Sequence, residues 1–347
     1  MEKLSTILVG TGFWGRGWAK VIAESQDASI AALVDLDEDA LEAVGKTVGV
    51  GRERQFPSLK AALDSVDAEA AVIVVPPEQH YEVAMAALAA GLHCVIEKPF
   101  APTLAEAREV VSAAEDARRK LMISQTFRFR RGARTVQKLI SDGAIGQIGS
   151  VHGRLFKYMH FTGFRATMPE PLIVDQAVHH FDFIRGIFGL EPARVRGYSF
   201  NPSWSYFKGN ANALVEFETA DGAFVSYSGS WVSLGGPQIN TSIDGSWDIQ
   251  GDGGAIQWNH NYVKLVPTDF ADVVYRKGAL EREGQVLEVP LAVLAAEERA
   301  GVLDEFVKAV REDRKPETHG QDNLKSLALV LGAVESCSHD GKWVNLE

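Results

Sequence analysis

A glycine-rich turn near the N-terminus constrains the fold of this chain more than any other feature. Gly10, Gly12 and Gly15 form a Gly-x-Gly-x-x-Gly segment that follows the apolar run Thr6–Val9 and opens the helical stretch Trp14–Ala23. The first glycine allows a tight turn, the second lets the backbone approach a bound group, and the third lets helix and strand pack closely. Because the N-terminus of a helix also offers free N–H groups and a positive dipole end, the pattern predicts a site for the pyrophosphate of a dinucleotide.

A dinucleotide site of this kind also has an acidic residue at the end of the second strand, and this chain has one there. Asp35 ends the next predicted strand, about twenty positions after the last glycine, where a carboxylate can accept hydrogen bonds from the ribose hydroxyls. It would repel a 2′-phosphate, and neither Leu36 nor Asp37 offers a cation for one. The expected cofactor is therefore NAD, with NADP disfavoured. The alternative is that Asp35 and Asp37 only cap the helix that begins at Glu38.

The first third of the chain alternates short apolar runs with helical periodicity, which is typical of a parallel sheet covered by helices. The predicted strands are residues 6–9, 30–34, 71–75, 93–96 and 121–124. The predicted helices are residues 14–23, 38–44, 78–90 and 104–119. We expect an α/β Rossmann domain with a doubly wound parallel sheet over residues 1–123.

The remainder of the chain has a different pattern, and 347 residues are too many for one ordinary core. From residue 146 to about residue 265 the apolar positions mostly alternate, interrupted by the helical stretch Leu172–Phe188. Two amphipathic helices close the chain, one through Leu303 and Phe306, the other through Leu324 and Leu327. Residues 124–347 are therefore predicted to form an α+β substrate-binding domain with a large, mainly antiparallel open sheet.

The composition excludes several classes of partner. The chain carries a net charge of −11 and is 46% hydrophobic and 23% charged, as a soluble globular protein is. Nucleic acid and anionic membrane surfaces both require a basic footprint, so neither is an expected partner. No apolar run approaches the roughly 20 residues of a membrane helix, and the N-terminal stretch is predicted to be a strand and not a signal peptide.

The two cysteines, Cys94 and Cys337, are too few for a disulfide framework and belong to no Cys-x-x-Cys pair. Each lies in an apolar or helical context and is interpreted as a small core residue. This usage fits the reducing cytoplasm, which is the expected location.

The first candidate catalytic group follows a predicted strand. Glu97-Lys98-Pro99 lies at the carboxyl end of a parallel strand, where open α/β sheets bind their ligands. A lysine there can donate a hydrogen bond to a substrate oxygen and stabilise developing alkoxide. The alternative is a Glu–Lys surface pair that ends the strand.

The second candidate is an Asp-x3-His pair in the helical stretch of the second domain. Asp175 and His179 are four residues apart and hence on one helix face. A histidine can take a proton from a hydroxyl, and a neighbouring carboxylate stabilises the imidazolium. His180 points about 100° away and is expected to be structural. The alternatives are a core histidine with a local salt bridge, or a metal site of Asp175, His179 and His180. No further His or Cys cluster stands nearby, so no metal is predicted.

The remaining site residues are assigned in two groups. The predicted cofactor-binding residues are Gly10, Gly12, Phe13, Trp14, Gly15, Asp35, Pro76, Glu97 and Lys98. The predicted substrate-binding residues are Lys98, Arg128, Tyr158, His160, Arg165, Asp175 and His179, with Arg130 as a further candidate. Arg128 and Arg130 follow the last predicted Rossmann strand. Tyr158, His160 and Arg165 belong to a polar-aromatic loop, and Asp175 and His179 to the helix after it.

These pieces together resemble the Gfo/Idh/MocA oxidoreductase family, which includes glucose–fructose oxidoreductase and inositol dehydrogenase. The resemblance covers nearly the whole chain. Its segments are GTGFWGRGW, VPPEQHYEVAMAALAAGLHCVIEKPF, SQTFRFR, DQAVHHFDFIRGIFG and the terminal run from Val302 to Val344. The Glu-Lys-Pro motif with a downstream Asp-x3-His is the most specific part of the pattern.

The resemblance implies Lys98 as the substrate-binding lysine, His179 as general base and Asp175 as its partner or a substrate ligand. It also implies that the open sheet of the second domain forms homodimers or homotetramers. Two departures concern the shape of the substrate pocket: residues 168–171 read Met-Pro-Glu-Pro where the family often has glycines, and Ala177 replaces a common glycine.

The expected function is an NAD(P)-dependent oxidoreductase acting on CH–OH groups. It would oxidise a secondary alcohol by hydride transfer to nicotinamide. The substrate class, a sugar or cyclitol, comes from the resemblance alone. Two alternatives stay open: an NAD-dependent glycosidase on the same fold, and a non-catalytic dinucleotide or sugar sensor.

Overall fold

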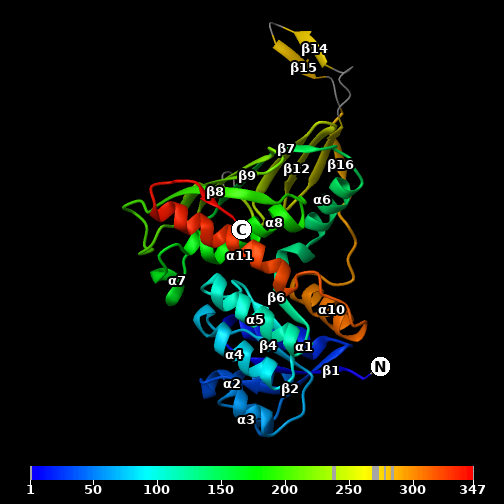
Figure 1. Cartoon of the computed structure of the whole chain (residues 1–347), viewed down its shortest axis with the longest axis vertical. Helices are drawn as coiled ribbons and strands as arrows, with labels where there is room; N and C mark the ends of the chain where they lie inside the picture. The colour runs from blue at the N-terminus through cyan, green and yellow to red at the C-terminus, as the bar shows by residue number, and fades with distance from the viewer. Residues whose placement is uncertain (1, 237–239, 268–272, 277–278, 283–284, 347) are drawn as a thin grey trace. The chain divides into compact units, whose positions relative to one another are not determined.

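The computed structural model describes residues 2–236, 240–267, 273–276, 279–282 and 285–346 (Figure 1). The chain divides into two compact units. The first contains Met1–Phe129 and Ala295–Leu327, and the second contains Arg130–Leu294 and Ala328–Glu347. The domain boundary between residues 123 and 124 stays a prediction.

The first unit is built on a parallel sheet of six described strands in the order β3-β2-β1-β4-β5-β6. The strands are β1 (Leu4–Val9), β2 (Ala28–Val34), β3 (Gln55–Phe56), β4 (Ala70–Ile73), β5 (His93–Glu97) and β6 (Leu121–Ser124). The order reverses between β1 and β4, and such a reversal opens a ligand crevice at the carboxyl ends of the strands. The doubly wound parallel sheet is thus confirmed.

Helices cover this sheet, including helices at the four predicted stretches 14–23, 38–44, 78–90 and 104–119. They are α1 (Phe13–Glu24), α2 (Glu38–Val48), η1 (Arg52–Arg54), α3 (Leu59–Leu63), α4 (Pro77–Ala89), α5 (Leu104–Asp116), η2 (Thr126–Phe129) and α10 (Glu298–Arg311). Helix α10 packs on the same core as α1, since Trp18 and Phe306 are both fully buried in one cluster with Leu8. Helix α11 (Gly320–Ser338) begins in the first unit and ends in the second.

The second unit is built on a mixed sheet in which the described residues form nine strands, in the order β16-β13-β12-β11-β7-β10-β9-β8-β17. The strands are β7 (Ile148–Phe156), β8 (Pro192–Phe200), β9 (Asn212–Thr219), β10 (Phe224–Ser230), β11 (Ser246–Gly251), β12 (Gly254–Asn259), β13 (Val263–Pro267), β16 (Leu287–Val289) and β17 (Val344–Asn345). Among these pairs β7 and β10 run parallel and the others antiparallel. The predicted large, mainly antiparallel open sheet is confirmed, and β14 (Val273–Arg276) pairs separately with β15 (Ala279–Arg282).

The helices of the second unit are α6 (Arg131–Ser141), α7 (Phe164–Thr167), a π-helical segment η3 (Leu172–Ala177) and α8 (Val178–Gly186). Aromatic side chains join α8 to the sheet: the Phe183 ring lies 6.0 Å from Trp247 and 5.0 Å from Trp258. In Figure 1, α6 and α8 lie on one face of the sheet. On β8 and β9, the side chains of Tyr198, Phe200 and Leu214 are exposed.

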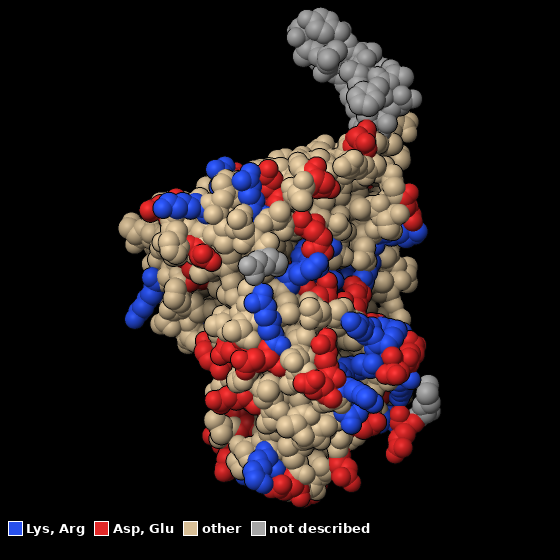
Figure 2. Space-filling model, in the orientation of Figure 1, with Lys and Arg blue, Asp and Glu red and all other residues tan. Residues whose placement is uncertain are grey.

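Surface charge is mixed on the face drawn in Figure 2. Both acidic and basic side chains of the described residues appear there, with acidic ones prevailing along the lower left edge, and no basic stripe crosses the whole face. None of the described helices is both long enough and apolar enough to cross a membrane.

Candidate active site

A cavity of about 510 Å³ opens in the first unit at the carboxyl ends of β1, β2 and β4. Its walls include Gly10, Gly12, Asp35, Leu36, Val74 and Pro76. The cavity lies where the strand order reverses, which is the place where doubly wound sheets bind dinucleotides.

The glycines of the turn each meet a different steric demand. Gly10 has φ +96°, and a Cβ there would lie 2.3 Å from the carbonyl oxygen of Val74. A Cβ on Gly15 would lie 2.1 Å from the carbonyl oxygen of Gly10. Gly12 has no such neighbour within 4 Å, so its backbone is open toward the cavity at the start of α1. This arrangement fits a pyrophosphate resting on the first turn of the helix.

Asp35 is held in a fixed orientation at the edge of this cavity. Its Oδ2 accepts hydrogen bonds from Thr11 N at 2.6 Å and Thr11 Oγ1 at 2.8 Å, and its Oδ1 accepts one from Asp37 N at 3.0 Å. The capping role belongs to Asp37, whose Oδ1 accepts a hydrogen bond from Ala40 N at 3.1 Å. The structure thus separates the two acids: Asp37 caps α2, and Asp35 lines the cavity. Thr11 is a supporting residue that the sequence did not single out.

Phe13 and Trp14 lie on the first turn of α1. The Phe13 side chain is exposed, and its ring makes an edge contact with Trp14 at 5.3 Å. The guanidinium of Arg299 stacks over the Trp14 ring at 4.7 Å. Both aromatic residues stand outside the walls of the cavity, whereas Pro76 forms part of them, so a cofactor role for Phe13 and Trp14 stays a prediction.

Glu97 supports the backbone that carries Lys98. Its Oε1 accepts hydrogen bonds from Trp18 Nε1 at 2.7 Å and Ser124 Oγ at 3.0 Å, and its Oε2 accepts one from Lys98 N at 3.2 Å. The carboxylate therefore binds groups on α1, on β6 and on the Lys98 backbone. Lys98 itself is half-buried, and the Lys98–Pro99 peptide bond is cis.

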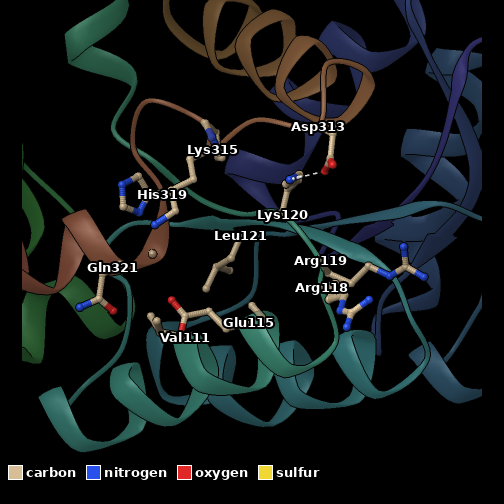
Figure 3. A pocket seen from close by; sticks show the side chains of 13 residues that line it. Val111, Glu115, Arg118, Arg119, Lys120, Leu121, Asp313, Lys315, His319 and Gln321 are labelled. Atoms are coloured by element: carbon tan, nitrogen blue, oxygen red, sulfur yellow. Dashed lines mark hydrogen bonds and ion pairs between the residues drawn. The ribbon is translucent and has the colours of Figure 1, made fainter.

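A second cavity of about 190 Å³ lies at the amino end of β6. Figure 3 shows Lys120 and Asp313 in an ion pair of 2.7 Å at its upper side, with Arg118, Arg119 and Lys315 around it. Because ligands of open parallel sheets bind at the carboxyl ends of the strands, we place the active site at the first cavity.

Asp175 and His179 lie in the second unit, both buried, on either side of a change in helical form. Asp175 belongs to the π-helical segment, and His179 follows in the first turn of α8. Such π-helical turns occur frequently at functional sites. The Arg165 guanidinium donates two hydrogen bonds to the Asp175 carboxylate, from Nε to Oδ2 at 2.8 Å and from Nη2 to Oδ1 at 3.3 Å. The structure thus brings two of the predicted site residues into direct contact.

His180 is turned into the core of the second unit. Its Nε2 lies 2.9 Å from the carbonyl oxygen of Ile243, to which it donates, and its Nδ1 accepts from the Tyr227 hydroxyl at 2.9 Å. Complete burial lowers the pKa of His180 to about 4, so the ring is neutral at physiological pH. With both nitrogens occupied, His180 does not fit the metal site considered as an alternative, and its predicted structural role is what the geometry shows.

The polar-aromatic loop before α8 is anchored by Tyr206, which the sequence did not indicate. Its hydroxyl donates to the carbonyl oxygen of Met159 and accepts from Phe161 N at 2.9 Å. The His160 ring lies 4.1 Å from the Tyr206 ring, and Tyr158 is 49% exposed. Tyr158 and His160 lie in this loop and Arg165 follows in α7, so all three belong to the second unit.

Arg128 and Arg130 are engaged in ion pairs inside their own units. Arg128 is buried in the first unit, with Nη2 3.4 Å from the Asp322 carboxylate. In the second unit Arg130 donates to Asp244, which also accepts from His260 Nδ1 at 2.8 Å. Burial acts to raise the pKa of Asp244, but the charge and hydrogen bond of Arg130, together with the hydrogen bond from His260, keep that pKa below its ordinary value. Substrate contact by either arginine stays a prediction.

The fold and the cavity define a dinucleotide-binding protein. Residues 4–125 match the family described as "Oxidoreductase family, NAD-binding Rossmann fold", and residues 133–257 match the GFO/IDH/MocA C-terminal domain. The chain belongs to the GFO/IDH/MocA family of NAD(P)-dependent oxidoreductases, as the motifs predicted.

Two relatives and one solved structure illustrate the range of similarity. D-apiose dehydrogenase of Paraburkholderia graminis is 26% identical, over 100% of this chain and 91% of that protein. Inositol 2-dehydrogenase of Rhizobium meliloti is 24% identical, over 95% of each chain. An oxidoreductase from Agrobacterium radiobacter, solved with NAD+, L-tartaric acid and magnesium, has a TM-score of 0.86 at 21% identity, covering 99% of this chain and 98% of that one.

Proposed function

We propose that the protein is an NAD-dependent dehydrogenase that oxidises a secondary alcohol of a sugar or a cyclitol. The observation that carries the proposal is the Lys98 turn, fixed by Glu97 at the end of β5, on the same sheet edge as a cavity shaped for a dinucleotide. The named activities of the relatives, on apiose and inositol, support the substrate class.

Three residues carry the chemistry in this proposal. Lys98 donates a hydrogen bond to the substrate oxygen and lowers the energy of developing alkoxide. His179 removes the hydroxyl proton as general base, and Asp175 stabilises the imidazolium that forms. Bound NAD supplies the hydride acceptor, so the protein groups contribute position and electrostatics.

Asp35 favours NAD in this proposal. Its carboxylate is fixed by Thr11 at the cavity edge, where it can accept hydrogen bonds from ribose hydroxyls. The adjoining Leu36 side chain is exposed and brings no positive charge for a 2′-phosphate. NADP should therefore bind more weakly than NAD.

Further proposals concern substrate contacts and assembly. Tyr158, His160 and Arg165 would contact the substrate from the second unit, and Arg128 and Arg130 stay candidate substrate contacts. A homodimer or homotetramer would form through the open sheet, where Tyr198 pairs in register with Leu214 on the exposed face.

A cytoplasmic location is proposed from the thiols. Both cysteines are free, and burial raises the pKa of Cys94 to about 12 and that of Cys337 to about 11. A raised pKa keeps both thiols protonated and unreactive, as in proteins of a reducing compartment.

The decisive experiment is a screen of NAD+ reduction over inositols, hexoses and pentoses. The proposal predicts NADH accumulation with at least one of them, and loss of that signal in Lys98→Ala. Release of a sugar from a glycoside without net NADH would indicate the glycosidase instead. NAD+ binding with no turnover of any compound would indicate the sensor.

A further inference from the structure

His80 is buried between two segments of the first unit that each belong to the candidate site. It lies in α4 with 1% of its surface exposed. Its Nε2 is 2.9 Å from the carbonyl oxygen of Val75. Its Nδ1 is 2.9 Å from the carbonyl oxygen of Pro99 and 3.2 Å from that of Phe100. One imidazole ring therefore touches the backbone at the ends of both β4 and β5.

The segment on the Nε2 side is part of the cofactor cavity. Val75 lines that cavity together with Val74 and Pro76. The carbonyl oxygen of Val74 is also the group that a Cβ on Gly10 would strike, so this segment packs directly on the glycine turn. A shift of Val75 would thus change the shape of the cavity where the pyrophosphate is expected to bind.

The segment on the Nδ1 side is the turn that carries Lys98. Pro99 and Phe100 follow Lys98 directly, and both are buried. The other side of this turn is held by Glu97, which accepts a hydrogen bond from Lys98 N. His80 and Glu97 therefore hold the backbone on both sides of Lys98.

The contacts at Nδ1 and at Nε2 of His80 cannot both be hydrogen bonds donated by a neutral ring. Carbonyl oxygens only accept hydrogen bonds, and a neutral imidazole carries a single N–H. Burial lowers the pKa of His80, although the three carbonyl oxygens and the Glu97 carboxylate act against that fall. Two acceptors converge on Nδ1 and one lies at Nε2, so the proton of the neutral ring is better placed on Nδ1, facing the Lys98 turn.

We propose that His80 is a positioning residue whose Nδ1–H holds the Pro99–Phe100 backbone and so sets Lys98 against the wall of the cofactor cavity. The consequence for catalysis rests on the proposed role of Lys98. The positioning itself does not, and it can be measured without a substrate.

Two substitutions separate the two contacts. The amide nitrogen of asparagine can take the place of Nδ1, and that of glutamine can take the place of Nε2. His80→Asn therefore keeps a donor toward Pro99 and Phe100, whereas His80→Gln keeps one toward Val75 only. Both variants are made in the full-length protein and remain polar, so a general loss of packing affects them alike.

The first readout is hydrogen–deuterium exchange, which needs neither substrate nor cofactor. In His80→Gln, exchange of residues 97–103 should rise by roughly tenfold, because the turn loses its donor and opens locally. In His80→Asn the same residues should exchange as in the wild type. Equal exchange of residues 97–103 in His80→Gln and wild type would overturn the proposal.

The second readout is turnover of the alcohol found in the NAD+ reduction screen. His80→Gln should lower kcat by about tenfold or more, since a misplaced Lys98 loses its alignment with the reacting oxygen. His80→Asn should rescue kcat, while KM and the Kd for NAD+ change little in His80→Gln. Equal losses of kcat in the two variants would show a merely structural role.

His93→Asn is the matched control. His93 begins β5 at the opposite edge of the sheet, where its Nδ1 accepts from Lys120 N at 2.9 Å, a bond that an asparagine oxygen can replace. Exchange of residues 97–103 and kcat should both stay at wild-type values. A change in this control equal to that in His80→Gln would contradict a role specific to His80.

A measurement on the wild type covers the case in which a variant does not fold. Nitrogen-15 NMR of the His80 ring reports which nitrogen carries the proton, and the proposal predicts a protonated Nδ1. A bare Nδ1 would overturn it. If the ring and exchange results hold but no alcohol reacts, the positioning stands and the proposed dehydrogenase function fails.

Discussion

Arg165 holds the Asp175 carboxylate through two hydrogen bonds, at 2.8 Å and 3.3 Å, inside the second unit. The guanidinium is flanked by the rings of Phe161, at 5.7 Å, and Phe164, at 4.7 Å. A residue of the polar-aromatic loop thereby fixes one member of the proposed catalytic pair. The loop and the helix that carries His179 are coupled through this ion pair.

Breaking the pair from either side should be costly. The side chains of Arg165 and Asp175 are only 16% and 11% exposed, so Arg165→Met removes a two-point hydrogen-bonded cation from a largely buried carboxylate and should destabilise the protein by about 3 kcal/mol. The double variant Arg165→Met/Asp175→Asn should recover at least about 1 kcal/mol relative to the sum of the single losses. Urea unfolding of the four proteins measures the cycle. Strictly additive losses would contradict the coupling.

Asp35 should decide the choice between cofactors. Asp35→Ala should weaken NAD+ binding by about 1.5–3 kcal/mol, the usual contribution of hydrogen bonds to a charged group, and should improve NADP+ binding. Asp37→Ala is the control: it removes the cap of α2 and should cost about 1 kcal/mol of stability without changing cofactor preference. Calorimetric titration of both cofactors tests this, and an unchanged NAD+/NADP+ ratio in Asp35→Ala would refute the assignment.

Two glycines of the turn should respond differently to the same added methyl group. Gly12 has φ −64° and open space around the new Cβ, so Gly12→Ala should change stability by no more than about 0.5 kcal/mol but weaken NAD+ binding, because the methyl group takes the space of the pyrophosphate. Gly15→Ala forces a Cβ to 2.1 Å from the carbonyl oxygen of Gly10 and should lower stability instead. Thermal unfolding and NAD+ titration distinguish the two. Unimpaired NAD+ binding by Gly12→Ala would place the pyrophosphate elsewhere.

Stability should fall as the pH is lowered from about 6.5 to about 4, in part because of His180. Its pKa is about 4 in the folded protein, below its ordinary value of 6.5. The unfolded chain therefore binds the proton more readily in this window, and protonation favours unfolding. The full effect, reached below the folded pKa, is about 3 kcal/mol. His180→Gln should show a shallower slope of unfolding free energy against pH, and an identical slope would contradict this account.

The parts of the fold that could be predicted are those that local patterns determine. Apolar runs, helical periodicity and the glycine turn indicated the order of elements in the first unit, and alternation indicated the antiparallel strands of the second. Strand β3 was missed because two residues, Gln55 and Phe56, are too short for any periodicity. The amphipathic pattern of α10 shows that it buries a face but not against which core, so its place beside α1 was not predicted.

In the candidate site, too, local sequence patterns indicate some residues but not the contacts between them. Residue types and spacing were enough to single out Gly10, Asp35 and Lys98 as candidates, because each lies directly after a strand of the parallel sheet. The π-helical form around Asp175 could not be predicted, since helical spacing over six residues does not separate π from α geometry. The contacts of Arg165 with Asp175 and of His80 with Pro99 depend on how the chain turns between them, which no periodic pattern in the sequence indicates.

The most direct test of the central claim is a comparison of NADH formation by wild type, Lys98→Met and His179→Asn on the best sugar or cyclitol of the screen. The account predicts that wild type accumulates NADH, and that loss of the general base His179 reduces kcat by about 10²–10⁴-fold while NAD+ still binds. Lys98→Met should also lose turnover, because the substrate oxygen loses its hydrogen-bond donor. Wild-type turnover by Lys98→Met, or product formed without net NADH, would contradict it.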